Sequence, residues 1–453
     1  MKVSLDTLVA LAKRRGFVYP GSEIYGGLAG TYDYGPMGVA LKKNIEQLWW
    51  NRFVTTRDDM YGLDSSIVMP EAVWKASGHL EGFTDPMTEC RNCKTRIRAD
   101  QVVDAILHTP FSVEEFNTKW KDILECPNCG KKGTLQEARQ FNLLFPIEMG
   151  ASSGGTTTGY LRGEIAQGMF VNFKNVIDSF HPKLPFGIAQ SGKAFRNEIA
   201  PREFLFRVRE FDLMEFEYFI KEADWEERFE YWRKEMWAWI EEVGIEKEAV
   251  HELEVSAEDR AHYSKRTIDF EFDFPMGRKE LYGLAYRTDY DLARHAEASG
   301  ENLTYLDEET KEKFIPHVIE PTFGLGRTVL AVLASAYRED ELGGETRVYL
   351  ALAPKVAPVK AMVSPLLKNK PELVAKARDV REMLRKVHPS IAWDDNGNIG
   401  KRYRRQDEIG TPWCVTVDFD TLEDGTVTVR DRDTGEQERL SVEAVVEKLR
   451  AAL

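Results

Sequence analysis

The sequence is poor in the features that mark secreted and membrane proteins. It holds 5 cysteines in 453 residues, and no apolar run approaches the roughly 20 residues that a membrane-spanning helix needs. Residues 1–17 carry three clustered basic residues but no long apolar stretch or small-residue cleavage site, so no secretory signal is expected. No internal repeat or low-complexity tract is visible. These absences favour a cytoplasmic protein without a membrane partner, and the length suits two or three domains.

An overall excess of positive charge is also missing. The formal net charge is −14, which at face value argues against a nucleic-acid-binding protein. Residues 347–405 differ, because they hold 14 Lys or Arg against 5 Asp or Glu, a local charge of +9. Such a segment can neutralise phosphates even on an acidic protein. A lysine-rich helix with a solvated face would have the same composition and is the alternative.

Four of the five cysteines form two Cys-x-x-Cys pairs, Cys90 with Cys93 and Cys126 with Cys129. Disulfides are not expected in a reducing compartment, whereas four thiolates suit the tetrahedral coordination of zinc. The 32 residues between the pairs exceed the spacing of a minimal zinc ribbon, and reduced or redox-active thiols are the alternative. Cys414 lies alone in an apolar run and is predicted to be a buried core residue.

Composition and periodicity suggest a core, two insertions and a C-terminal domain. Trp225, Trp232 and Trp239 recur every seven residues in a glutamate-rich segment, which predicts a packed stripe on a helix. Beyond Gly343-Gly344, strand-like and helix-like segments alternate, which predicts a compact α/β domain with a mixed sheet. The expected boundaries are 1–89 for the first part of the core, 90–138 for the cysteine-rich insertion, 139–340 for the rest of the core with a helical insertion at 222–262, and 341–453 for the C-terminal domain.

Two arginine-containing segments flank a short turn around Pro201. Residues 193–198 read Lys-Ala-Phe-Arg-Asn-Glu, and residues 207–211 read Arg-Val-Arg-Glu-Phe. Apolar and charged residues alternate over 204–219, which predicts a strand with one buried face. Arginines on its polar face, together with Arg196, would offer permanently charged, bidentate donors suited to a polyphosphate. A surface hairpin with solvated charges is the alternative for this segment taken alone.

A third motif, residues 320–327, reads Glu-Pro-Thr-Phe-Gly-Leu-Gly-Arg and precedes a helix predicted over 328–337. Glycines at the end of a strand let a ligand approach the backbone closely, and Arg327 would lie at the start of the helix. The Gly-x-Gly pair is not a dinucleotide-binding fingerprint, because the third glycine and its downstream acid are missing. The motif is weak alone and becomes specific in combination with the two arginine segments.

Together these segments resemble motifs 2 and 3 of the class II aminoacyl-tRNA synthetases. Residues 30–38 and a helix predicted over 39–53 are similar to motif 1, the dimer-forming element of that family. The resemblance covers essentially the whole chain, and the motifs stand in family order. It implies an α+β catalytic core with an antiparallel sheet flanked by helices, a Cys-rich insertion, a helical insertion and a C-terminal α/β anticodon-binding domain. Segments similar to the dimeric glycyl-tRNA synthetases in particular are 161–168, 213–217, 280–283, 287–291 and 398–412.

The resemblance implies ATP-dependent activation of glycine to glycyl-adenylate and transfer to the 3′ end of tRNA-Gly. Mg²⁺ would accompany ATP, and a structural Zn²⁺ would occupy the four cysteines. The carboxylate of the substrate attacks the α-phosphate, so positioning and charge stabilisation must supply the rate. Arg196 would hold the α-phosphate, Glu198 the adenine amino group and Arg207 the outer phosphates. Phe211 and Arg327 would enclose the adenine ring. The expected ATP site comprises Arg196, Asn197, Glu198, Phe206, Arg207, Val208, Arg209, Glu210, Phe211, Glu280, Leu281, Gly324, Leu325, Gly326 and Arg327.

Glycine must be selected by its ammonium group and by the exclusion of larger side chains. Glu164, Glu215 and Glu320 match carboxylates that surround the amino group in the family, and Arg98 matches a further substrate-side position. A rigid small pocket rejects every bulkier amino acid sterically, so no editing site is expected. The expected glycine site comprises Arg98, Glu164, Phe211, Asp212, Leu213, Met214, Glu215, Arg287, Glu320, Pro321, Thr322, Phe323 and Gly324.

Three positions depart from the family pattern. Thr322 replaces a common serine and adds a methyl group beside a pocket for the smallest amino acid. Gly326 replaces a frequent acidic residue just before the motif 3 arginine. Tyr286 stands where asparagine is usual. These departures bear on glycine affinity and on the orientation of the arginine.

The C-terminal domain carries a basic run over 401–405 that includes Tyr403. Positive charge beside an aromatic ring suits unstacked anticodon bases. Two alternatives to a homodimeric glycyl-tRNA synthetase stay open. One is a class II synthetase for another small amino acid, and the other is a non-catalytic nucleic-acid-binding paralogue. The presence of Arg196, Arg207 and Arg327 disfavours the paralogue.

Overall fold

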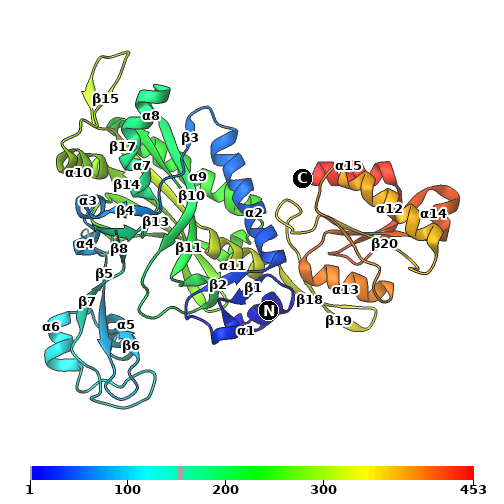
Figure 1. Ribbon diagram of the computed structural model, residues 1–453, viewed down its shortest axis with the longest axis horizontal. Helices are drawn as coiled ribbons and strands as arrows, with labels where there is room; N and C mark the ends of the chain where they lie inside the picture. The colour runs from blue at the N-terminus through cyan, green and yellow to red at the C-terminus, as the bar shows by residue number, and fades with distance from the viewer. Residues whose placement is uncertain (1–2, 151–156) are drawn as a thin grey trace.

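A seven-stranded sheet forms the centre of the computed structural model, which describes residues 3–150 and 157–453 (Figure 1). The strand order is β12-β13-β14-β17-β11-β10-β3, in which β3 pairs in parallel with β10 and the remaining pairs are antiparallel. The strands are β3 (Met60–Gly62), β10 (Phe186–Phe195), β11 (Glu210–Ile220), β12 (Val250–Glu254), β13 (Arg266–Phe274), β14 (Gly277–Thr288) and β17 (His317–Gly324).

Both faces of the sheet are covered by helices, because the central strands present apolar side chains on both faces. Successive side chains of a strand point to opposite sides. On β11, Met214 and Phe216 belong to the core that contains helices α2, α9 and α11. Leu213 and Phe219 belong to a second core with helices α7, α8 and α10. This arrangement confirms the predicted antiparallel sheet flanked by helices. The six helices are α2 (Pro36–Trp50), α7 (Ala166–Val171), α8 (Phe173–Phe180), α9 (Trp225–Glu242), α10 (Tyr290–Ser299) and α11 (Leu325–Ala336).

The predicted helical insertion at 222–262 is shorter than expected. Trp232 and Trp239 of α9 are fully buried, as their seven-residue spacing predicted, and Trp225 packs at the edge of the same core. Gly244, at φ 85°, ends the helix, because glycine reaches this left-handed conformation without strain. The chain then adds the edge strand β12 to the central sheet. The second half of this segment is therefore a strand followed by a loop and not helix.

The predicted strand over 204–219 is wrong at its start. Phe204–Phe206 form a single 3-10 turn, and β11 begins at Glu210. Phe204, Leu205 and Phe206 are all buried, which an extended strand with one buried face does not allow. The residue before the turn, Glu203, and the first residue of the turn, Phe204, have positive φ. Arg207 is therefore presented by a loop and not by the polar face of a strand.

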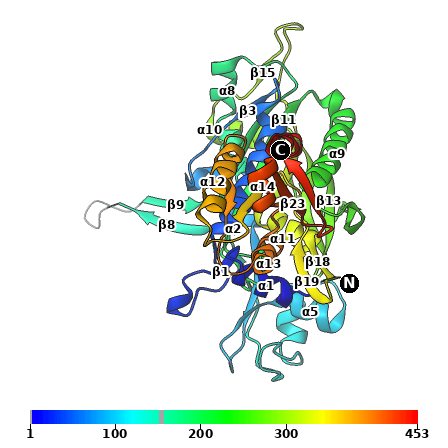
Figure 2. The same ribbon diagram turned by 90° about the vertical axis from the view of Figure 1, so that its right-hand side faces the viewer.

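The cysteine-rich insertion forms a separate small module with its own core (Figure 1, cyan). Its three-stranded sheet has the order β6-β5-β7 and begins before residue 90. A second three-stranded sheet, β4-β9-β8, carries the β8–β9 hairpin, which projects from the body (Figure 2). The elements of both are β4 (Val68–Pro70), β5 (Thr84–Glu89), β6 (Arg96–Arg98), α5 (Ala99–Leu107), α6 (Val113–Glu115), the π-helical turn Phe116–Trp120, β7 (Arg139–Asn142), β8 (Phe145–Met149) and β9 (Thr157–Leu161).

Shorter elements connect these parts. A helix and a two-stranded ribbon begin the described chain, and two short helices precede the cysteine-rich module. None of the helices in the described ranges combines the length and apolar character needed to cross a bilayer. These elements are α1 (Leu5–Arg14), β1 (Val18–Pro20), the 3-10 turns Glu23–Tyr25, Glu222–Asp224 and Lys247–Ala249, β2 (Tyr32–Tyr34), the π-helical turn Asn51–Thr55, α3 (Glu71–Ala76), α4 (His79–Gly82), β15 (Tyr305–Leu306) and β16 (Lys313–Phe314).

The C-terminal domain lies to one side of the part of the molecule that contains the seven-stranded sheet (Figure 1, orange and red). Its five-stranded sheet, β21-β20-β22-β23-β24, has parallel and antiparallel pairs, so the predicted mixed α/β domain is confirmed. Cys414 is 1% exposed, as predicted for a core residue. The elements are β20 (Ala361–Pro365), α12 (Pro371–Arg385), β21 (Ile391–Trp393), α13 (Ile399–Ile409), β22 (Trp413–Val417), α14 (Phe419–Asp424), β23 (Thr426–Asp431), β24 (Gln437–Ser441) and α15 (Val442–Ala452).

The expected domain boundary at 340/341 falls inside a hairpin. Strands β18 (Tyr337–Leu342) and β19 (Glu345–Leu350) pair with each other. Gly343 and Gly344 form their turn with φ of 64° and 81°, the left-handed conformation that a two-residue hairpin turn requires. The glycine pair that suggested a linker therefore joins two paired strands.

The basic run over 401–405 is directed largely into its own domain. Tyr403 is buried and shares a hydrogen bond of 2.8 Å with Thr416. Arg402 is 2% exposed, and Arg405 forms an ion pair of 2.8 Å with Asp394. Tyr403 therefore cannot stack on an unpaired base in this conformation, because its ring packs in the core next to α13. The expectation that this aromatic ring faces anticodon bases is wrong.

Candidate active site

A cavity of about 560 Å³ opens where β11, β13, β14 and β17 meet the cysteine-rich module. Strand ends, the loop before β5 and the loop between β12 and β13 supply its walls. It brings together most of the residues expected at the two substrate sites. Those that line it are Arg98, Glu164, Arg196, Glu198, Phe206, Arg207, Val208, Phe211, Asp212, Leu213, Glu215, Glu280, Leu281, Glu320, Thr322, Gly324, Gly326 and Arg327.

The remaining expected residues lie outside the cavity lining. Met214 and Phe323 point into the core that contains α2, α9 and α11, because alternate strand residues face opposite sides of the sheet. Arg209 donates to the carbonyl oxygen of Ala29 at 2.6 Å and to that of Glu198 at 3.0 Å, so it braces the loop instead. The residues absent from the lining are Asn197, Arg209, Glu210, Met214, Arg287, Pro321, Phe323 and Leu325.

The half of the cavity around Arg196 contains charged side-chain atoms without hydrogen-bond partners among the described residues. Arg196 donates from Nε to the Gly163 carbonyl at 3.1 Å, and its guanidinium lies 5.0 Å from the ring of Phe83 and 5.2 Å from that of Phe211. Glu198 Oε2 and Arg207 Nη1 are buried without a hydrogen-bond partner among the described residues. Buried polar atoms are almost always paired. Two such unpaired atoms of opposite charge in one cavity indicate a polar ligand.

A pair of carboxylates lies at the β13–β14 side of the same cavity. Arg327 lies 4.3 Å from the ring of Phe206 and forms an ion pair of 3.1 Å with Glu280, which lowers the pKa of that carboxyl. Burial, followed by the charges of Glu280 and Glu271, raises the pKa of Asp269 to about 7. Carboxylate oxygens are the ligands that a hard divalent cation such as Mg²⁺ prefers. Asp269 was not identified from the sequence.

The opposite end of the cavity holds three carboxylates above small residues. Strand register places Glu215 beside Thr322 on β17, and Thr322 beside Gly283 on β14. In the next row Glu320 lies beside Ala285. A Cβ added at Gly283 would meet nothing within 4 Å. The floor therefore combines negative charge with room for a small group.

Two of these carboxylates are held differently. His79 Nε2 lies 3.1 Å from one oxygen of Glu164, and Gln167 donates to the other at 2.9 Å. Burial alone would raise the pKa of Glu164, but the neighbouring His79 and Arg287 lower it. Glu215 accepts from Thr322 Oγ1 at 2.5 Å, while its second oxygen is buried and unpaired among the described residues.

The charge state of Glu215 is therefore sensitive to its surroundings. Burial, followed by the charge of Glu164, raises the pKa of Glu215 to about 7. The unpaired oxygen and the raised pKa have the same physical cause, which is a carboxylate removed from water without enough donors. A cationic ligand would supply what is missing.

Arg287 lies beneath the floor and not in the cavity. It is 1% exposed and donates to both oxygens of Asp291, at 2.8 and 2.9 Å, and to Glu320 at 2.6 Å. Its guanidinium also lies 3.7 Å from the ring of Tyr263. Arg287 therefore orients Glu320 from behind. His79 was not identified from the sequence, because its contact with Glu164 joins segments far apart in the chain. Gln167 and Asp291 lie in the family-like segments 161–168 and 287–291 but were not predicted as site residues.

The three departures from the family pattern have distinct structural meanings. Thr322 keeps the hydroxyl and uses it on Glu215. Gly326 has room for a side chain, since an added Cβ would lie at ordinary contact distance, 3.5 Å, from its nearest neighbours. Tyr286 is buried in the core that contains α2, α9 and α11, where its ring stacks on that of Trp225 with centroids 4.6 Å apart. Tyr286 therefore lies away from the cavity lining.

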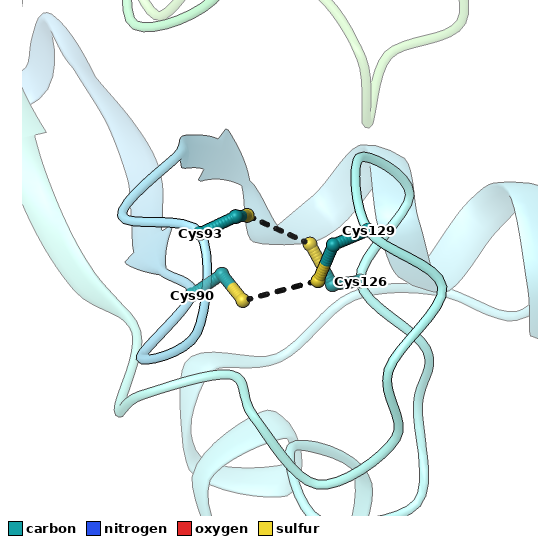
Figure 3. A group of neighbouring side chains, drawn as sticks. All are labelled: Cys90, Cys93, Cys126 and Cys129. Carbon is teal, nitrogen blue, oxygen red and sulfur yellow. Dashed lines mark hydrogen bonds between the residues drawn. The ribbon is translucent and has the colours of Figure 1, made fainter.

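The cysteine-rich module contributes to the cavity and carries a separate cluster. Arg98 reaches the cavity while bonding to Asp85 at 2.8 Å and to Asp100 at 2.6 Å. The four thiols of the two Cys-x-x-Cys pairs face one another (Figure 3). Their sulfur atoms all lie within 4.8 Å of one another, in a position to hold a metal ion. Two short sulfur–sulfur distances join one Cys-x-x-Cys pair to the other, 3.7 Å between Cys93 and Cys126 and 3.8 Å between Cys90 and Cys129.

Comparison with protein families assigns both large parts of the chain. Residues 156–336 match the tRNA synthetase class II core domain (G, H, P, S and T), and residues 360–452 match the anticodon binding domain. The fold is thus that of a class II aminoacyl-tRNA synthetase.

Curated relatives narrow this class to one family. The chain is 49% identical over 449 residues to the glycine--tRNA ligase of Streptomyces coelicolor, covering 97% of this chain and 96% of that protein. It is 49% identical over 451 residues to the glycine--tRNA ligase of Clostridium acetobutylicum, with 97% and 96% covered. For that of Caldanaerobacter subterraneus the identity is 48% over 454 residues, with 98% and 97% covered. The chain belongs to the glycine--tRNA ligase family.

Proposed function

We propose that the protein activates glycine with ATP to glycyl-adenylate and then transfers the glycyl group to the 3′ end of tRNA-Gly. A glycine carboxylate oxygen attacks the α-phosphorus of ATP, and the bond to the β-phosphate oxygen breaks to release pyrophosphate. A hydroxyl of the terminal ribose then attacks the glycyl carbonyl, loses its proton, and AMP leaves. The observation that carries this proposal is one cavity with an unpaired donor (Arg207 Nη1) and an unpaired acceptor (Glu198 Oε2) at one end and three carboxylates at the other.

The nucleotide roles follow from the charges that lack partners. Arg196 would hold the α-phosphate and stabilise the charge that develops there, because it lines the cavity with a fork of N–H donors. Glu198 Oε2 would accept from the adenine amino group, and Arg207 Nη1 would donate to the outer phosphates. Phe211 and Arg327 would enclose adenine. The guanidinium of Arg196 lies over the ring of Phe211, and that of Arg327 lies over the ring of Phe206. When the ligand binds, each guanidinium would either leave this ring or contact the ring and the ligand together.

Residues would also be available for the metal ion that accompanies ATP. Asp269 and Glu280 line the same wall of the cavity. Mg²⁺ neutralises phosphate charge and orients the leaving pyrophosphate when it is bound. The raised pKa of Asp269 fits this assignment, because a nearby cation would favour the ionised form.

The end of the cavity with the three carboxylates would recognise the ammonium group of an amino acid that has no side chain. Glu215 offers an unpaired oxygen, and Glu164 and Glu320 line the same end. The Thr322 hydroxyl orients Glu215. Larger amino acids would be rejected sterically, which is the favourable direction for discrimination by size.

The remaining assignments concern partners. A homodimer through residues 30–53 and a cytoplasmic location belong to the same proposal and are supported by the family. The C-terminal domain would receive the anticodon of the tRNA. The four cysteines would hold a structural Zn²⁺ as tetrahedral thiolate ligands, since their sulfur atoms already converge.

The experiment that tests this function is amino-acid-dependent ATP–pyrophosphate exchange on the purified protein. Glycine, alanine and serine are assayed separately, followed by charging of tRNA-Gly. Exchange with glycine alone is expected. Exchange with alanine or serine would favour a synthetase for another small amino acid, and no exchange with any of them would favour a non-catalytic nucleic-acid-binding protein.

A further inference from the structure

Glu217 is a buried carboxyl group behind the glycine end of the cavity, with no role in the function proposed above. It follows Glu215 by two residues on β11, so both side chains point to the same face of the sheet. Glu217 is 0% exposed. Carboxylate oxygens of Glu215, Glu217 and Glu320 lie within 4.8 Å of one another. Neither oxygen of Glu217 has a hydrogen-bond partner among the described residues.

The nearest guanidinium is already committed to other carboxylates. Arg287 on β14 donates to both oxygens of Asp291 on α10 and to one oxygen of Glu320 on β17. No hydrogen bond from Arg287 to Glu217 is formed. The other titratable groups packed around this cluster are Glu215 on β11, Glu164 before α7, His79 on α4, His295 on α10 and Tyr263 in the loop before β13.

An ionised Glu217 would be unfavourable at this place. A buried carboxylate without a donor or counter-ion loses its hydration without compensation, and such groups take up a proton instead. Burial, followed by the charge of Glu320, raises the pKa of Glu217 well above its ordinary value. A protonated carboxyl group also gains an O–H donor. Glu215 and Glu320 lie next to Glu217, and each accepts a hydrogen bond, from Thr322 and from Arg287 respectively.

We propose that Glu217 is a neutral carboxylic acid in the working protein and that its O–H group positions the carboxylates of Glu215 and Glu320 for the ammonium group of glycine. Glu217 is thus a positioning residue and not a third charge of the ammonium site. The inference rests on the proposed function for the identity of the ligand. The neutral state of Glu217 rests on the cluster alone and has its own readout.

Three substitutions on one strand, two at Glu217 and one at Glu215, test the proposal by steady-state ATP–pyrophosphate exchange. Glu217→Gln keeps the shape, the neutral charge and an N–H donor, so the KM for glycine should stay within about threefold of wild type. Glu217→Leu removes the donor and should raise the KM for glycine roughly tenfold with little change in the KM for ATP. Glu215→Gln removes a charge that faces the ligand and should raise the glycine KM by about 10- to 100-fold.

Infrared spectroscopy tests the protonation state independently of catalysis and of the folding of the leucine variant. The carbonyl band of a buried protonated carboxylic acid should be present at pH 8 in the wild type and absent in Glu217→Gln. The proposal is overturned by any of three results. These are an unchanged spectrum between the two proteins, a Glu217→Gln variant as impaired as Glu215→Gln, or a folded Glu217→Leu variant with wild-type glycine KM. A wild-type protein without glycine-dependent exchange would refute the proposed function, while the infrared result would still decide the state of Glu217.

Discussion

The catalytic cavity and the C-terminal domain both bury arginine side chains, but they use them differently. In the cavity, Arg207 Nη1 is buried without a partner among the described residues. In the C-terminal domain, Arg430 donates to both oxygens of Asp407 at 2.8 and 3.0 Å, and Arg347 is held by Asp340. A guanidinium paired by its own chain, such as that of Arg430, serves the fold, whereas an unused buried donor that lines a cavity, such as that of Arg207, is available to a ligand. Local charge alone does not separate the two uses, since 347–405 is the more basic segment.

The largest expected effect is on the stability of the C-terminal domain. Asp407→Ala leaves Arg430 buried without its bidentate partner and also removes the 3.7 Å ion pair with Arg347. Breaking a buried pair from one side costs about 3–5 kcal/mol in the free energy of unfolding. Urea denaturation followed by circular dichroism measures this loss. The control is Glu345→Ala, whose partner is Arg404 and whose side chain is 81% exposed, and which should change the free energy by less than about 0.5 kcal/mol. Equal stability of the two variants would break the comparison.

The next largest effect is on catalysis in the cavity. Arg196→Ala should reduce glycine-dependent ATP–pyrophosphate exchange by about 10²- to 10³-fold, the usual effect of removing one preorganised donor to developing charge. Binding of tRNA-Gly should stay nearly unchanged. Arg385→Ala truncates an exposed arginine of the C-terminal domain as a control and should leave exchange unaffected. Wild-type exchange by Arg196→Ala would remove the role assigned to this residue.

A smaller effect concerns pH and the two differently held carboxylates. Glu215, with a pKa raised to about 7, is mostly ionised at pH 8 and mostly protonated at pH 6. The ammonium group of glycine requires the ionised form, so the KM for glycine should rise about tenfold from pH 8 to pH 6, because the competent fraction falls by that factor. Glu164, whose pKa is lowered, stays ionised throughout this range. The measurement is exchange kinetics at saturating ATP, and Glu215→Gln should lose the pH dependence. A glycine KM that is flat over this range would contradict the assignment.

Local sequence motifs predicted the residues that line the cavity, but they did not predict the contacts that hold these residues in place. Arg196, Glu198 and Arg207 lie in one short segment, so their convergence follows from neighbouring strands and one loop. The bond between His79 and Glu164 joins positions 85 apart, and no periodicity in a single sequence connects them. Glu217 did carry a signal, because a period of two on β11 places it on the face of Glu215.

The errors in secondary structure have local physical causes. Gly244 marks the end of α9 in the sequence, and the segment after it alternates in a strand-like way that the glutamate-rich composition concealed. Tyr403 was misplaced for the opposite reason. Charged neighbours suggested a surface position, whereas the helical period of α13 turns Arg402 and Tyr403 inward.

The smallest effect tests whether any part of the basic run reaches tRNA. Lys401 is exposed, and no ion pair involves it in the part of the chain that the structure describes, in contrast to Arg405 with its 2.8 Å contact to Asp394. Lys401→Ala should lower the salt dependence of tRNA-Gly binding by about 0.9 in log–log slope if one phosphate contact is lost. Arg405→Ala should leave the slope unchanged and lower stability instead, because its charge is already neutralised within the domain. Filter binding over a range of salt concentrations, with thermal unfolding of both variants, separates these outcomes. A slope change in Arg405→Ala but not in Lys401→Ala would reverse the assignment of bound and free charge.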